Sequence, residues 1–310
     1  MLSQTYPDFE LIVVNDGSTD GSEKVVEGHP DPRIRLVQQE NAGPGAARNR
    51  GIAEARHQLV AFLDADDEWL PGFLETVLAL RRRFPEAAIW STAYRTVSPS
   101  GKEETPGPVM RLSDGTGRQF RPISYFAEGR PFYTSCVLVR KDAIVAVGGF
   151  PANMLIGEDT DTWFRMALRY PIVWCSDSRA IEHKNAGNHL SGSGEYRYHG
   201  MLPIMASFRQ FVIERGGDEG ISDVVYRHIA AQLERQMWVN FLAGDGDVTR
   251  QSVRDLRSIN RCGFFGYTAY LLSYLPHGFL RVLWSSYRAV RGKSPKLGEF
   301  RSIFNVRRGT

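Results

Sequence analysis

The sequence predicts an α/β fold, with a mostly parallel sheet flanked by helices and followed by a helical C-terminal region. Short apolar, β-branched runs alternate with helical patterns over residues 9–84, and this alternation is typical of a parallel sheet. From about residue 201 the pattern turns helical with little strand signal. We therefore place a boundary near residues 192–200 and expect two domains, at 1–195 and 196–310.

Each element follows from a local pattern. Apolar runs that end at polar loops predict strands at residues 9–14, 34–37, 59–63, 88–97, 135–139 and 172–175. Apolar residues at helical spacing, and small residues behind an early proline, predict helices at residues 20–27, 44–55, 71–84 and 160–170. Residues 98–117 are rich in proline, glycine and charge, which predicts a surface loop.

The composition is that of an ordinary globular protein, since 42% of the 310 residues are hydrophobic and 24% are charged. The net charge of +3 decides little about partners. Cys136, Cys175 and Cys262 are scattered without a Cys-x-x-Cys pair, so we expect neither a disulfide framework nor a thiolate metal site. Because no signal-peptide pattern opens the chain, we expect a cytoplasmic location.

The sharpest chemical signal is the acidic run at residues 64–68, where four carboxylates follow an apolar strand. Like charges this close repel one another unless a cation lies among them. At a strand end Asp64 and Asp66 would project the same way, and such hard oxygen ligands suit Mg²⁺ or Mn²⁺. A solvated acidic turn ahead of the helix at Pro71 explains the run equally well.

A second polar loop, at residues 15–22, follows the first predicted strand. Ligands of open α/β sheets bind beyond the carboxyl ends of the strands, so Asp16 is a candidate acceptor for hydrogen bonds from a base or ribose. The alternative is that Ser18, Thr19 or Asp20 caps the next helix.

Acids also open the predicted helix at residues 160–170, where the helix dipole favours them whether or not they do chemistry. A partly buried aspartate there could take a proton from an attacking hydroxyl, and Asp159 is the candidate base. His183 follows an extended segment and is a candidate metal or phosphate ligand, with a structural role as the alternative.

Residues 262–280 contain no Lys, Arg, Asp or Glu and are rich in aromatic residues. Pro276 divides them into pieces shorter than the ~20 residues that a membrane crossing needs. An interfacial helix pair on the inner face of the membrane is one interpretation. A helical cap packed on the first domain, or on a second copy in a homodimer, is the other.

Taken in order, residues 15–20, 41–51, 63–67, 148–150 and 158–159 resemble the family-two glycosyltransferases. The resemblance covers roughly the first 190 residues, and several spaced motifs are more specific than any one of them. It implies a GT-A fold and inverting transfer of a sugar from a nucleotide-diphosphate sugar, in polysaccharide or glycan assembly. A glycan or lipid-linked acceptor is implied as well, with no nucleic-acid partner.

The resemblance also implies a role for individual residues. Asp16, Asp64 and Arg48 would bind the nucleotide, and Asp66 would bind Mg²⁺ or Mn²⁺ with Asp64 close by; His183 remains a candidate further ligand from its own position. Asp159 would be the catalytic base, and Glu158, Trp163 and Arg165 would line or brace the acceptor side.

One departure from the family keeps two alternatives open. Members usually begin with a further strand and helix, about 30 residues, before the turn at residues 4–7, and we expect this chain to lack them. A nucleotide-sugar-binding or membrane-associated remnant without full activity is therefore one alternative. A nucleotidyltransferase is the other, although the Glu158-Asp159 context favours sugar transfer.

Overall fold

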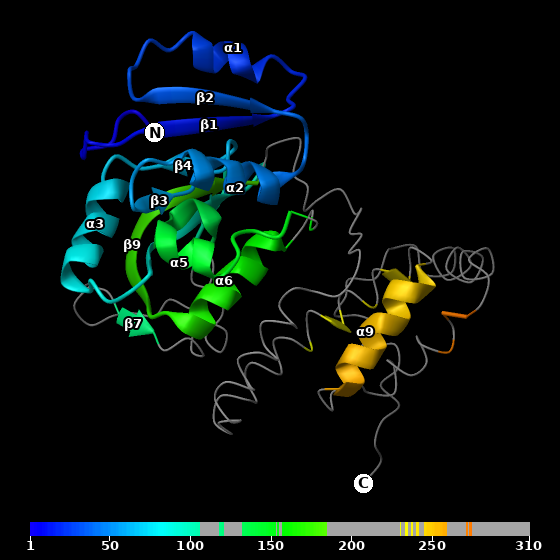
Figure 1. Ribbon diagram of the computed structural model, residues 1–310. Coiled ribbons are helices and arrows are strands. Elements are labelled where there is room, and N and C mark those ends of the chain that lie inside the picture. Colours follow the sequence, from blue (N-terminus) through cyan, green and yellow to red (C-terminus); the bar gives the residue numbers. More distant parts are fainter. Residues whose placement is uncertain are drawn as a thin grey trace. The chain divides into compact units, whose positions relative to one another are not determined.

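The computed structural model describes residues 1–105, 118–120, 132–152, 154 and 157–184, and also 230, 233, 234, 237, 240, 241, 245–258, 271, 273 and 274 (Figure 1). The chain divides into two compact units, Met1–Ala231 and Gln232–Thr310. The predicted boundary at 192–200 and nearly all of residues 262–280 lie outside the described residues, so the predictions made for them stay predictions.

The first unit alternates strands and helices over its first half, as the sequence predicts. Its elements are β1 (Leu11–Asp16), α1 (Ser22–Glu27), β2 (Ile34–Gln39), α2 (Pro44–Glu54), β3 (Leu59–Ala61), β4 (Glu68–Trp69), α3 (Phe73–Arg83), β5 (Ile89–Val97), β6 (Glu103–Glu104), β7 (Arg118–Phe120), the 3₁₀ helix η1 (Thr134–Cys136), β8 (Val137–Arg140), α5 (Lys141–Ala146), α6 (Glu158–Arg169) and β9 (Ile172–His183). The second unit contains α9 (Gly246–Ser258). All six predicted strands and all four predicted helices of the first unit are confirmed, with shifted ends.

The α/β class is confirmed, but the sheet is mixed rather than mostly parallel. One sheet pairs β1 with β2, and the other has the order β3-β8-β5-β9-β4, with β6 on β5 and β7 on β9. Of the pairings among described residues, β1–β2 and β5–β9 are parallel, and the other five are antiparallel. The larger sheet pairs β3 with β8 and β8 with β5 in antiparallel fashion, so the alternation of strands and helices along the chain did not indicate the direction of these pairs.

The core of the first unit lies where the larger sheet meets its helices. Phe73 and Val77 on α3 are fully buried, as their helical spacing predicts, and Phe73 stacks on Trp69 at 4.1 Å between ring centroids. On α6, Trp163 packs against Phe62 and Phe150 at 5.9 and 5.4 Å. In Figure 1 the curved strand β9 is flanked by α3 on one side and by α5 and α6 on the other. Within the described part of the chain, no helix has both the length and the apolar character to span a bilayer.

Candidate functional site

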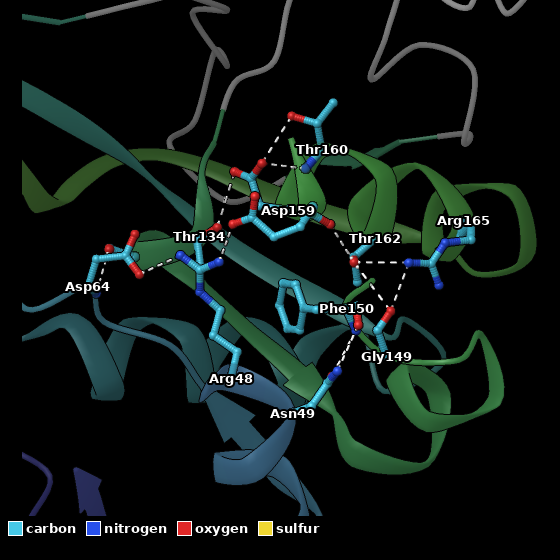
Figure 2. A network of polar contacts seen from close by, with 12 residues as sticks. Arg48, Asn49, Asp64, Thr134, Gly149, Phe150, Asp159, Thr160, Thr162 and Arg165 are labelled. Atoms are coloured by element: carbon cyan, nitrogen blue, oxygen red, sulfur yellow. Dashed lines mark hydrogen bonds and ion pairs between the residues drawn. The ribbon is translucent and has the colours of Figure 1, made fainter. Parts of the chain in front are cut away.

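Arg48 of α2 joins two of the three predicted acidic stretches. Its guanidinium donates to the Asp64 carboxylate at 2.7 Å and to the Glu158 carboxylate at 2.6 Å. Figure 2 shows Arg48 between Asp64 and the start of α6, with the ring of Phe150 beside the side chain. The Arg48 guanidinium therefore joins Asp64, which sequence reasoning assigned to the nucleotide, to Glu158, which it assigned to the acceptor side.

The ion pairs of Arg48 lie away from bulk water. The Glu158 side chain is 7% exposed and the Arg48 side chain 15%, whereas Asp64 keeps 35%. Burial lowers the pKa of Arg48, but the charges of Asp64 and Glu158 outweigh it and raise the pKa overall. Burial, together with the neighbouring charge of Asp159, raises the pKa of Glu158 to about 7 although Arg48 opposes the shift. Arg48 thus stays charged, and Glu158 titrates near neutral pH.

The acidic run forms a turn, not a strand extension. β3 ends at Ala61, and the Asp67 N–H donates to the Asp64 carbonyl at 3.0 Å. The strand alternation that we expected to align Asp64 with Asp66 therefore does not apply to them. Asp66 is exposed. Burial raises the pKa of Asp67 to about 6, although the hydrogen bond from Ser135 opposes the shift, and the charges of Asp64 and Asp66 add to the rise.

Asp159, the predicted base, lies half-buried in the first turn of α6. One carboxylate oxygen accepts from the backbone N–H and hydroxyl of Thr160 at 2.5 and 3.2 Å. The other accepts from the Thr134 hydroxyl at 3.3 Å, as Figure 2 shows. α6 begins behind Gly157, whose left-handed φ of 85° favours glycine.

Trp163 and Arg165, predicted for the acceptor side, are buried. Trp163 is 1% exposed and packs in the aromatic cluster with Phe62 and Phe150. Arg165 is 7% exposed; it donates to the Asp161 carboxylate at 2.6 Å and to the Gly149 carbonyl at 2.7 Å. Of the two roles that the resemblance left open, their burial fits bracing rather than direct contact with an acceptor.

A loop is fastened between α2 and α6 beside these residues. The Asn49 side chain donates to the Phe150 carbonyl at 2.7 Å and accepts from the Phe150 N–H at 2.8 Å (Figure 2). Arg165 holds the carbonyls of Val147 and Gly149 from the other side. α2 comes so close to the loop that a Cβ on Gly45 would lie 2.7 Å from the Pro151 carbonyl oxygen. The distance between α2 and α6 is therefore set by this loop.

Asp16 lies at the end of β1, and it contacts α2 as well. Its carboxylate accepts from the backbone N–H groups of Ala42 and Gly43 at 2.9 and 2.8 Å, and from the Gln39 side chain at 2.7 Å. Gly43 is the N-cap of α2, where the helix dipole favours a negative charge. The N-cap of α1 is Gly21, without a side-chain capping bond, so none of Ser18, Thr19 and Asp20 is the cap; the Asp20 carboxylate accepts from the Ser22 N–H at 3.0 Å just ahead of it. All three acidic stretches thus have a partner on α2 or at its N-terminus.

His183, a predicted cation ligand, lies beside the acidic run, next to the residues that follow Asp66. His183 ends β9; its backbone N–H is 3.4 Å from an Asp67 carboxylate oxygen, and its ring nitrogen is 3.4 Å from a Glu68 oxygen. Among the described residues, no three His, Cys, Asp or Glu side chains are grouped so as to hold a metal ion. The donor set still fits Mg²⁺ or Mn²⁺ in kind, since these ions use one or two carboxylates plus water and phosphate oxygens.

The residues that sequence reasoning missed are Asn49, Thr134 and Ser135. The Ser135 hydroxyl donates to Asp67 at 2.6 Å and accepts from the Asp64 N–H at 3.0 Å. Asn49 lies within α2 and the other two lie in η1, and all three are neutral, so no charge signal could have singled them out.

A cavity of about 740 Å³ lies elsewhere, lined by residues of α3, β9 and the N-terminal segment, and includes none of the predicted site residues. Its charged lining residues include Arg179 and Asp177, which pair with each other at 2.7 Å. We place the functional site at Arg48 because buried, charge-perturbed carboxylates converge there.

Known proteins resemble this chain in sequence. Residues 1–144 match the family model of Glycosyl transferase family 2. The amylovoran biosynthesis glycosyltransferase AmsE of Erwinia amylovora is 29% identical over 174 residues, 55% of this chain and 62% of that protein. The succinoglycan biosynthesis protein ExoU of Rhizobium meliloti is 32% identical over 200 residues, 59% of this chain and 56% of that protein. An uncharacterized glycosyltransferase of Escherichia coli, YibD, is 44% identical over 82 residues, 26% of this chain and 24% of that protein. The matched regions thus span less than two thirds of these relatives.

A solved structure resembles this one in fold. Staphylococcus aureus TarS 1-349 in complex with UDP-GlcNAc has a TM-score of 0.64 and 18% identity, and the match covers 95% of this chain and 86% of that chain. At this identity the likeness shows the fold, which is the GT-A type of α/β fold. Residues 1–144, just under half of the chain, thus match the model of Glycosyl transferase family 2, and the chain shares the GT-A type of fold.

Proposed function

We propose that this chain transfers a sugar from a nucleotide-diphosphate sugar to an acceptor hydroxyl, with inversion at the anomeric carbon. The observation that carries the proposal is the convergence of three acidic stretches on α2: Asp16 binds at its N-terminus, and Asp64 and Glu158 share Arg48. In a chain that matches the model of this family over residues 1–144, such an arrangement supports donor binding on the Asp64 side and acceptor activation on the α6 side.

Asp159 is the proposed base. It takes the proton of the acceptor hydroxyl while the oxygen forms a bond to the anomeric carbon and the bond from that carbon to the diphosphate breaks. A single displacement of this kind inverts the anomeric configuration. The pKa of Glu158 is raised to about 7, but its side chain is 7% exposed and bonded to Arg48, so it is a poor partner for an incoming acceptor.

Mg²⁺ or Mn²⁺ is proposed as the cofactor, held by Asp66 with Asp64 and His183 nearby. When bound there, a divalent ion would neutralise the charge of the leaving diphosphate. Arg48 supplies a fixed positive charge beside Asp64 in any case.

The names of the relatives narrow the proposal. AmsE and ExoU are named for amylovoran and succinoglycan biosynthesis, which supports a role in polysaccharide assembly with a glycan or lipid-linked acceptor. TarS 1-349 was solved with UDP-GlcNAc, which makes uridine donors the first to test. We propose action in the cytoplasm, at the inner face of the membrane.

The test is turnover of a panel of UDP- and GDP-sugars with Mn²⁺. Asp159→Asn should lower kcat by about 10²–10⁴-fold, the usual contribution of a general base, and Asp66→Ala should abolish metal-stimulated turnover. The matched control is Asp177→Asn, an aspartate 46% exposed on β9 that pairs with Arg179 and should leave turnover unchanged. Activity that survives both Asp159→Asn and Asp66→Ala removes the assignment.

Two further outcomes separate the alternatives. Full activity in the presence of a chelator removes the metal and leaves the transfer reaction. Calorimetric binding of UDP or GDP by a wild-type chain that turns over no donor favours the binding remnant over the enzyme.

A further inference from the structure

We propose that Thr134 and Ser135, consecutive residues of η1, are positioning residues that hold the proposed base and the acidic turn in one fixed arrangement. The proposal rests on the proposed function, because it assigns Thr134 to Asp159 and Ser135 to the turn at residues 64–67. It adds a device that sets the distance between the donor and acceptor halves of the site.

Ser135 holds the acidic turn at two points and the adjoining strand β4 at a third. Its hydroxyl donates to an Asp67 carboxylate oxygen at 2.6 Å and accepts from the Asp64 N–H at 3.0 Å, and its carbonyl accepts from the Trp69 indole N–H at 2.5 Å. Ser135 is 0% exposed, so these bonds do not compete with water. One hydroxyl therefore binds both ends of the turn.

Thr134 orients the proposed base. Its hydroxyl, on a residue 1% exposed, donates to Asp159 Oδ2 at 3.3 Å, while Thr160 holds Oδ1. Held at both oxygens, the carboxylate has a defined rotation about its side-chain bond. The single neutral donor on Oδ2 leaves that oxygen a lone pair for an acceptor proton.

η1 is itself rigidly anchored. The Cys136 N–H donates to the Tyr133 carbonyl at 3.1 Å, and the Tyr133 N–H contacts the Cys136 sulfur at 3.1 Å. The chain then enters β8, which is paired on both sides, with β3 and with β5. The two hydroxyls thus project from one short segment fixed to the interior of the sheet.

The polar identity of these residues is best explained by the carboxylates they bind. A buried hydroxyl contributes less to packing than an apolar group of the same shape unless it is bonded. Here both hydroxyls bond to carboxylates of the site. Displacing a catalytic group by about 1 Å can lower the rate on the order of 10²-fold, so a segment that fixes two such groups sets the rate of transfer.

The experiment compares Thr134→Val, which keeps the shape and loses the hydroxyl, with Thr134→Ser, which keeps the hydroxyl. The control is Thr92→Val, at a threonine that is 0% exposed and whose hydroxyl binds a carbonyl within β5. Kinetics use the nucleotide sugar that the wild-type chain turns over, with UDP-GlcNAc tried first, and calorimetry measures UDP binding. We expect Thr134→Val to lower kcat at least tenfold with KM for the donor within threefold. Thr134→Ser should restore kcat to within threefold, and Thr92→Val should match wild type.

Ser135 is tested on the donor side. Ser135→Ala should weaken UDP binding and raise KM for the donor at least fivefold. Ser135→Cys keeps the shape of the side chain but has a weaker donor, so its UDP affinity and KM should lie between those of Ser135→Ala and wild type. If Ser135→Ala does not fold, the Ser135→Cys variant provides the test.

The outcomes that overturn the proposal are specific. A kcat for Thr134→Val equal to that of Thr92→Val, a Thr134→Ser variant as impaired as Thr134→Val, or unchanged UDP binding in both folded Ser135 variants would each do so. Asp159→Asn is measured in parallel. An active Asp159→Asn, or a wild type without turnover, refutes the proposed function and this proposal with it; an inactive Asp159→Asn with normal Thr134→Val refutes the positioning role alone.

Discussion

Removing the charge of Arg48 should destabilise the first unit in a pH-dependent way. Arg48→Met keeps most of the side-chain stem and deletes the bonds to Asp64 and Glu158 at 2.7 and 2.6 Å. Asp64, 35% exposed, regains water at little cost, but the Glu158 carboxylate, 7% exposed, does not. Breaking a buried pair so that one charge stays unpaired costs about 3–5 kcal/mol. At a pH where Glu158 is protonated, the loss of unfolding free energy falls to about 1–2 kcal/mol, because only the hydrogen bonds are then lost.

The sign of the pH dependence follows from Glu158. Its folded pKa of about 7 lies above its ordinary value of 4.5, so its contribution to stability is present below pH 4.5 and is lost as pH rises through 7. Arg48 lowers this pKa, so the variant's folded pKa is higher still, and its deficit relative to wild type grows between pH 6 and pH 8. Urea unfolding at both pH values measures it. Arg50→Met on the same helix is the control, because Arg50 is 51% exposed and its pair with Glu54 is worth at most about 0.5 kcal/mol. Equal losses for the two variants, or a loss for Arg48→Met that does not change with pH, would refute the reasoning.

Three more predictions concern the same region. The pKa of Asp67 is about 6 in the folded chain and 3.8 ordinarily, so the unfolding free energy of wild type should fall by about 1–3 kcal/mol between pH 4 and pH 6. Asp67→Asn should not show this fall. Urea unfolding without divalent ions measures both, and identical pH profiles would contradict the prediction. Gly45→Ala should lower Tm and cost about 1–3 kcal/mol, since its Cβ would lie 2.7 Å from a backbone oxygen. Gly51→Ala, whose Cβ would have no neighbour nearer than 3.7 Å, should be neutral or stabilising by up to about 1 kcal/mol. A reversed order of the two variants would contradict the close approach of α2 to the loop. Arg165→Met removes the 2.6 Å ion pair with the buried Asp161 carboxylate. Breaking a buried pair should cost about 3–5 kcal/mol in thermal or urea unfolding, and a loss below about 1 kcal/mol would show that the pair contributes little.

The sequence predicted the elements whose patterns are local. The apolar run of β1, the proline-led α2 and the spacing of Phe73 and Val77 on α3 each depend on a short stretch of chain, so their positions followed from periodicity. The directions of the strands did not follow. β8 and β5 pair antiparallel although 39 residues separate Val97 from Val137, counting the residues between them, and no local signal encodes that pairing.

The candidate site was predicted in part for the same reason. Charge and motif singled out Asp64, Arg48, Glu158 and Asp159. In the structure, Arg48 pairs with Asp64 and with Glu158. That Arg48 pairs with both carboxylates is a tertiary fact, since Glu158 lies 110 residues away along the chain. The sequence also predicted an acceptor-side role for Trp163 but did not indicate that it is buried. An aromatic residue on an amphipathic helix gives the same sequence pattern whether it lines a site or packs in the core.

The most direct test of the central claim is a crystal structure of the chain with bound UDP and Mn²⁺. We predict the diphosphate and the ion at the turn formed by residues 64–67, beside Arg48, with Asp159 facing the position that the sugar would occupy. A diphosphate bound in the cavity between α3 and β9, with the acidic turn and Arg48 free of ligand, would contradict the account.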